Sequence, residues 1–225
     1  STIILSQLAT GAMERSGALM DNNVAAPYES ARRHSEFLSE QGKNGSRSSK
    51  RTDILNDELI SRVLVPLANN NWSFVPEYKI DCPRGGTFKV DVAGFYKDEL
   101  RCIFLLKAVE TSYNKNSHNY ANTCEGETGR IFDHPDRGDN LSLFTVDWIP
   151  NKVRAPTPKN KTRTELTKVP NMDLSEQRWN THLQSQHRNA CVTFCKIRFD
   201  YDSSTGATNI DGATKLLDGL KRVFR

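Results

Sequence analysis

The sequence of 225 residues predicts a single α/β domain with a central mixed β-sheet flanked by helices. Apolar residues recur at helical spacing over 53–67, from Ile54 to Leu67. The period then changes to two in segments 72–80, 87–96 and 100–109, which is typical of strands. Strands that follow helices and have further helices between them favour an α/β fold.

The first 51 residues predict helices and a basic arm. Segments 6–20 and 28–41 have helical character, with a break expected at 21–23. Residues 42–51 are polar and basic, with no large apolar side chain. They are compatible with a solvated loop, or with an arm whose Lys50 and Arg51 contact phosphates.

The rest of the chain continues the alternation of strands and helices. The further expected elements are a turn at 83–86, a hairpin turn at 97–99, a helix at 118–132, a break at 133–140, a strand at 141–149, a long basic loop at 150–170, a helix at 174–187, a strand at 190–201, a turn at 203–206 and a helix at 211–224.

Composition narrows the functional classes. No apolar run approaches the ~20 residues of a membrane span, and the first residues lack a secretory signal pattern. The five cysteines form no CxxC pair, so we expect reduced core thiols. A net charge of +4 permits a nucleic-acid partner without requiring one. Positive charge is concentrated at 43–51 and 152–163, which points to DNA more strongly than the total does.

The chemistry is expected where two apolar strands carry charged residues. Asp91 lies inside one strand, and Lys107 ends the strand that follows the hairpin turn. An antiparallel hairpin brings the two side chains to the same end of the sheet. A carboxylate there can hold Mg²⁺ beside a phosphate, and a lysine can orient water and stabilise negative charge. The alternative is a structural Asp–Lys pair.

This arrangement resembles the PD-(D/E)XK nuclease superfamily, best known from type II restriction endonucleases. Asp91 matches the first acid of the family pattern and Lys107 its lysine, while Val90 stands where the pattern has proline. The resemblance covers residues 52–150 and implies an αβββαβ core. It makes Glu58, on the preceding helix, a candidate for the additional acid that some members supply.

The second acid of the pattern is missing, because Leu105 occupies its position. The chain could be an inactivated variant, a non-catalytic relative, or a branch in which the acid has migrated to the following helix. We favour migration, with Glu125 and Glu127 as candidates. Two residues apart on a helix, they point about 200° apart, so only one can face the site. We expect Glu127, because Arg130 can support it one turn later.

The same segment is rich in polar side chains suited to DNA. Amides and guanidinium groups read adenine and guanine edges, and lysine suits phosphate. The candidate DNA contacts are Lys115, Asn116, Asn119, Asn122 and Arg130. A solvated helix face is the alternative interpretation.

The resemblance implies a Mg²⁺-dependent, site-specific endonuclease of double-stranded DNA in a prokaryotic cytoplasm, with Asp91 and Glu127 as metal ligands and Lys107 at the attacking water. A homodimer is expected, because a two-fold protein matches a palindromic site. The expected organisation is an arm at 1–51, a catalytic core at 52–150 and a closing part at 151–225. A non-catalytic DNA-binding module and a repair or transposon-type nuclease stay open as alternatives.

Overall fold

The structure is a computed structural model that describes residues 2–45, 48–81, 86–111, 113–133, 140–155, 165–169 and 174–225. The helices are α1 (Thr2–Glu40), α2 (Ser49–Leu59), α3 (Val65–Leu67), α4 (Tyr113–Phe132), α5 (Leu174–Arg178) and α6 (Ala213–Val223), with π-helical turns η2 (Ile60–Leu64) and η3 (Trp179–Leu183). The strands are β1 (Trp72–Asp81), β2 (Thr87–Tyr96), β3 (Glu99–Ala108), β4 (Ser142–Pro150), β5 (Lys152–Ala155), β6 (Glu165–Lys168), β7 (Cys191–Asp202) and β8 (Gly206–Asp211).

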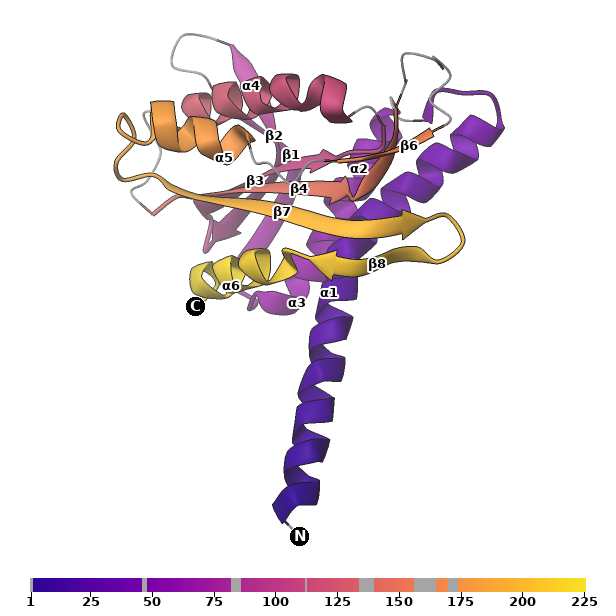
Figure 1. The fold of residues 1–225 in the computed structure, drawn as a ribbon. Helices are drawn as coiled ribbons and strands as arrows, with labels where there is room; N and C mark the ends of the chain where they lie inside the picture. The colour runs from indigo at the N-terminus through magenta and orange to yellow at the C-terminus, as the bar shows by residue number, and fades with distance from the viewer. Residues whose placement is uncertain are drawn as a thin grey trace.

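Six strands form one mixed sheet in the order β1-β2-β3-β4-β7-β8 (Figure 1). The pairs β1–β2, β2–β3 and β7–β8 are antiparallel, and β3, β4 and β7 run parallel in the centre. Helix α4 connects the parallel neighbours β3 and β4. The expected α/β class is confirmed, and the elements from α2 to β4 follow the expected αβββαβ order.

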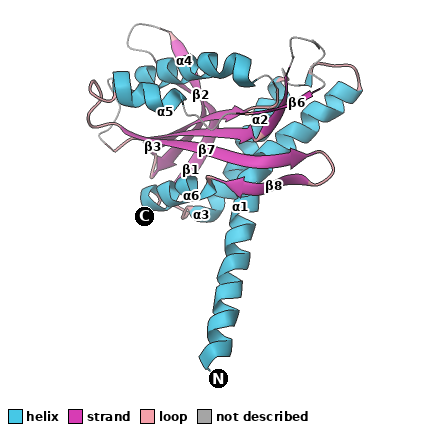
Figure 2. Cartoon of the chain, viewed as in Figure 1, coloured by secondary structure: helices cyan, strands magenta, loops and turns pink. Residues whose placement is uncertain are grey.

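Helices cover both faces of this sheet (Figure 2). On one face, side chains from α1, α2 and α6, such as Tyr28, Leu59 and Leu216, pack against Phe104 in one apolar cluster. On the other face, α4 and η3 close a second cluster that contains Ile103 and Leu105 of β3. Strand β3 is therefore buried on both sides, as its nearly continuous apolar sequence requires.

The N-terminal region differs from the expectation of two helices. Helix α1 is continuous, so the break predicted at 21–23 is wrong, and the helix also contains Pro27. Val24, Ala25 and Tyr28 are buried against the sheet, and packing of this stretch outweighs the low helix propensity of the preceding asparagines. The first half of α1 extends away from the body of the molecule (Figure 1).

Four further boundaries differ from the sequence prediction. The basic segment enters α2 at Ser49, and the loop predicted at 150–170 contains the β5–β6 hairpin. Strand β8 was not expected. It includes residue 211, where the last helix was predicted to begin, and that helix begins at Ala213. The helix expected at 174–187 consists of α5 and η3 and ends at Leu183. Most residues of the turn at 83–86 and the break at 133–140 lie outside the described residues.

None of the helices in the described parts of the chain combines the length and the apolar character needed to cross a membrane.

Candidate active site

The candidate site lies where β2 and β3 separate. Their pairing ends at Val92 and Phe104, while β2 stays paired with β1 as far as Thr87. Just beyond this last pair, the backbone N–H of Leu106, two residues after Phe104, donates to Oδ2 of Asp91 at 2.7 Å. The carboxylate takes the place of a backbone acceptor and is thereby fixed at the fork between the two strands.

Lys107 follows Leu106 and points to the face that α4 covers, because side chains alternate along a strand and Leu105 packs on that face. Its positive charge lowers the pKa of Asp91 and also the pKa of Glu127 on α4. The charge of Asp91 in turn raises the pKa of Glu127. The three groups expected to form the site are therefore within electrostatic reach of one another.

Burial dominates the electrostatics of both carboxyl groups. It raises the pKa of Asp91 more than the Leu106 N–H and Lys107 lower it. It also raises the pKa of Glu127 against the opposing charges of Lys107 and Arg130. Two partly buried carboxylates are thus incompletely compensated by the neighbouring cations, and perturbed titrations of this kind are common at functional sites.

The donor set suits a hard cation. Mg²⁺ is usually held by one or two carboxylates together with water and substrate phosphate oxygens, so Asp91 and Glu127 would suffice. In the described parts of the chain, no group of three or more His, Cys, Asp and Glu side chains could hold a metal by itself. Any cation here would depend on water or a substrate for its remaining ligands.

Glu125 faces away from this site. Its Oε2 lies 3.7 Å from Nη1 of Arg178 on α5, in an ion pair between the two helices. Glu125 and Glu127 point in different directions around the axis of α4. Glu125 is directed to α5, and the charges of Lys107 and Asp91 act on Glu127. The geometry therefore favours Glu127 over Glu125 as the migrated acid.

The remaining acid, Glu58, lies on α2, against the opposite face of the sheet. Its Oε2 accepts from Nε of Arg62 at 3.2 Å in an i,i+4 ion pair. Glu58 is not among the groups that shift the pKa of Asp91 or Glu127. The structure does not bring it together with the other candidates.

The basic arm separates into two environments. Lys50 is exposed on α2. Arg51 instead turns inward, where Nε pairs with Oε1 of the buried Glu110 and Nη2 donates to the carbonyl of Ala108. Its guanidinium group thus supports the end of β3, which differs from the phosphate contact expected of a solvated arm.

The polar side chains of α4 differ in their surroundings. Asn116 is half-buried, and Asn119 and Arg130 are exposed. Asn122 accepts a hydrogen bond from Arg178. The side chain of Lys115 lies outside the described residues.

Asp147 is a site neighbour that local sequence patterns do not reveal. In the parallel β3–β4 pair it lies opposite Lys107, and both residues line a small cavity under the start of α4. Its charge raises the pKa of Cys124, a thiol whose pKa Glu127 also raises. The register between β3 and β4 would have predicted this neighbour, because it places Lys107 and Asp147 side by side.

Leu105 has a structural explanation. It is buried and packs with Ile103, Leu143 and Phe194 in the cluster under α4. A carboxylate at this position would lie in that apolar cluster, where an unpaired charge is costly.

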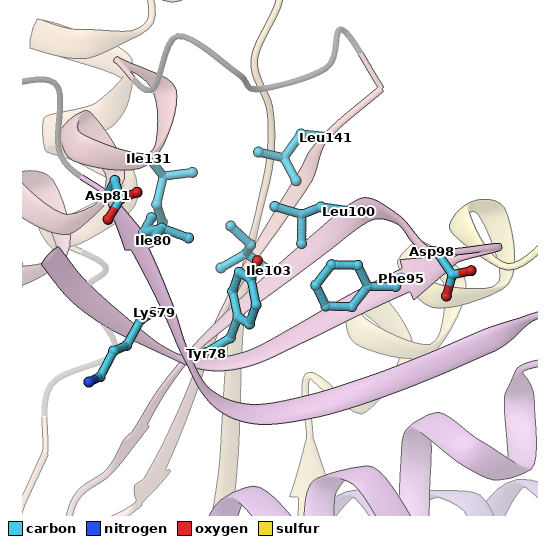
Figure 3. Close-up of a pocket in the computed structure, with 10 residues that line it drawn as sticks. All are labelled: Tyr78, Lys79, Ile80, Asp81, Phe95, Asp98, Leu100, Ile103, Ile131 and Leu141. Atoms are coloured by element: carbon cyan, nitrogen blue, oxygen red, sulfur yellow. The ribbon is translucent and has the colours of Figure 1, made fainter.

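A separate cavity of about 370 Å³ lies between the ends of β1 and β2 and the last turn of α4 (Figure 3). The rings of Tyr78 and Phe95 pack edge to face in its wall, with their centroids 5.2 Å apart. The exposed Asp81 and Asp98 lie at its rim. Asp91, Lys107 and Glu127 do not line it. The charged groups, and not this hollow, therefore define the candidate site.

No protein-family model matches the sequence, and no curated protein or solved structure is significantly similar to the chain. None of these comparisons supports the resemblance to the PD-(D/E)XK superfamily that residues 52–150 suggest.

Proposed function

We propose that this chain is a metal-dependent DNA endonuclease of the PD-(D/E)XK type. The observation that carries the proposal is the convergence of Lys107 with two partly buried carboxylates, Asp91 and Glu127, at the fork between β2 and β3. Burial that raises both carboxyl pKa values makes a cation the natural partner of the site.

Each residue has a role in this proposal. Asp91 and Glu127 would hold Mg²⁺, which when bound supplies a Lewis acid beside the scissile phosphate. Asp91 is oriented for this by the Leu106 N–H. Lys107 orients the attacking water and stabilises the negative charge that develops on the phosphate.

The substrate in this proposal is double-stranded DNA with a specific sequence, cut by a homodimer of a prokaryotic restriction system. The exposed polar side chains of α4, which begins six residues after Lys107, support a duplex lying across this face. The basic residues of the N-terminal arm and of β5, including Lys50 and Lys152, add positive charge at the surface.

The decisive experiment is plasmid cleavage with Mg²⁺ and with EDTA. We expect cutting by the native chain only with Mg²⁺, and a loss on the order of 10²-fold or more in Asp91→Asn, Lys107→Ala and Glu127→Gln. Glu58→Gln is the matched control, because it removes a carboxylate on the opposite face of the sheet, and it should cut like the native chain.

Three outcomes would change the assignment. Loss of cutting in Glu125→Gln with retention in Glu127→Gln would exchange the roles of the two glutamates. Cutting by Leu105→Glu and not by the native chain would indicate an inactivated variant. Salt-sensitive DNA binding without any cutting would replace the nuclease by a non-catalytic DNA-binding module.

A further inference from the structure

Arg178 at the end of α5 is held by three side chains of α4. Its Nη1 donates to Oδ1 of Asn122 and lies 3.7 Å from Oε2 of Glu125. Its Nη2 lies 3.4 Å from Nδ1 of His118. The three partners stand at i, i+4 and i+7, so they form one face of α4. A guanidinium group with this many partners is held in one orientation.

The held group is still at the surface. The side chain of Arg178 keeps 25% of its exposure and that of Glu125 keeps 34%. His118, Asn119 and Asn122 beside them are exposed as well. A ligand that approaches this face of α4 can therefore reach both a guanidinium and a carboxylate.

The charges of this surface favour base edges over phosphate. The carboxylate of Glu125 offsets the charge of Arg178 and would repel a phosphate. In the major groove, a G·C pair presents two acceptors on guanine, O6 and N7, and one donor on cytosine, N4. A guanidinium next to a carboxylate presents the complementary pattern of donors and acceptors.

The position of the cluster suits a base pair close to the cut. Glu127 belongs to the same helix as the cluster, five residues after Asn122, which corresponds to about 7.5 Å along the axis. Neighbouring base pairs are about 3.4 Å apart along each strand. Because Glu125 points about 200° away from Glu127 around α4, the helix width of about 10 Å adds to this separation. The pair that faces the cluster would then lie about four base pairs from the phosphate at Glu127.

We propose that Arg178 and Glu125 bind the major-groove edge of a G·C base pair, with Asn122 and His118 as positioning residues. This inference rests on the proposed function, because it takes duplex DNA to lie across α4. The competing interpretation is a latch that only holds α5 against α4.

The test is a sequence profile of DNA selected from a randomised library by the full chain. Cleaved products are sequenced after digestion with Mg²⁺. The native chain should require a G·C pair near the cut. Arg178→Ala should relax that one position by about 5- to 150-fold and leave the other positions unchanged. Arg178→Lys should not restore it, because an ammonium group lacks the planar fork.

The matched control is Arg62→Ala. Arg62, on η2, also pairs with a glutamate, Glu58 of α2, but at the opposite face of the sheet, so its loss should leave the profile unchanged. If Arg178→Ala does not fold, Asn122→Ala should relax the same position to a smaller extent. An unchanged profile in both Arg178→Ala and Asn122→Ala, or an equal loss on all sequences, would overturn the inference in favour of the latch.

Failure of the proposed function has a different signature. If the native chain cuts nothing, the same library is selected by retention on the native protein. Retained DNA whose G·C requirement disappears in Arg178→Ala supports the base contact and refutes the nuclease. A library that is neither cut nor retained overturns both proposals.

Discussion

Two charge clusters lie near the carboxyl end of β3. One surrounds a buried carboxylate and the other is partly buried, and they are built in different ways. One centres on Glu110, with Arg32 and Arg51 from the N-terminal helices. The other, on the face of the sheet that α4 covers, joins Asp91 and Glu127 to Lys107. In the first, Arg32 and Arg51 pair directly with Glu110, and Arg32 also pairs with Glu36. In the second, Lys107 and Arg130 act on the carboxyl groups only through their charges.

Direct ion pairs and hydrogen bonds make the Glu110 cluster self-sufficient. Glu110 Oε2 lies 3.3 Å from Arg32 Nη1, and Ser35 Oγ donates to Oε1 at 2.8 Å. Arg51 also donates to the carbonyl of Ala108, so the cluster fastens α1 and α2 to the strand that carries Lys107. Every part of this arrangement is explained by stability.

Weaker compensation of its carboxylates makes the Asp91 cluster incomplete. Burial raises the pKa of both acids in spite of Lys107, so the folded protein keeps two charges that it does not fully compensate. Compensation, rather than burial, is therefore what distinguishes the two clusters. The same kind of substitution should therefore have opposite effects on stability in the two clusters.

The largest effect is expected at Glu110. Glu110→Gln leaves Arg32 and Arg51 without their shared carboxylate and should lower the free energy of unfolding by about 3–5 kcal/mol. Urea denaturation followed by circular dichroism measures the change. A loss below about 1 kcal/mol would show that the cluster does not stabilise the fold as its geometry indicates.

The fold could be predicted to the extent that its patterns are local. The apolar strand pair 87–96 and 100–109 and the helix over 53–67 are readable because their side chains repeat at the period of the element. The break at 21–23 was wrong because tertiary packing of Val24 and Tyr28 keeps α1 continuous. Strand β8 was missed because its polar sequence owes its conformation to pairing with β7.

The residues of the candidate site could likewise be predicted only where local patterns connect them. The proximity of Asp91 and Lys107 could be predicted because one hairpin connects their strands. Asp147 required the register of a parallel pair, and Arg178 required a contact with a helix 56 positions away. Arg51 was expected to contact phosphate from a basic arm, because its partner, Glu110, is 59 positions distant and no local pattern connects the two. Local patterns carry no information at such separations.

The opposite sign is expected at Asp91. Asp91→Asn keeps an oxygen that can accept from the Leu106 N–H and removes a poorly compensated charge. We expect it to raise the free energy of unfolding at neutral pH by about 0.5–2 kcal/mol, as is common when a functional site is neutralised. Urea denaturation beside the native chain measures this. A loss of more than about 1 kcal/mol would place Asp91 with the structural cluster.

The pH dependence provides a smaller effect with a defined sign. The folded pKa of Asp91 lies above its ordinary value, so the folded state holds a proton over a range in which the unfolded state has lost it. Stability therefore falls as pH rises through that range, and the penalty is complete above the folded pKa. The stability difference between Asp91→Asn and the native chain should grow over this range. A constant difference would contradict the raised pKa, and Mg²⁺ should reduce the gap at neutral pH.

The smallest effect on stability is expected at Glu58, which belongs to neither cluster. Its ion pair with Arg62 lies on the surface of α2, with 27% and 56% of the two side chains exposed, and water screens such pairs. Glu58→Gln should change the free energy of unfolding by no more than about 0.5 kcal/mol. It should also leave the pH dependence of stability unaltered, because Glu58 contributes to neither cluster. A change above about 1 kcal/mol, measured by the same denaturation, would connect Glu58 to a buried network and restore it as the additional acid of the site.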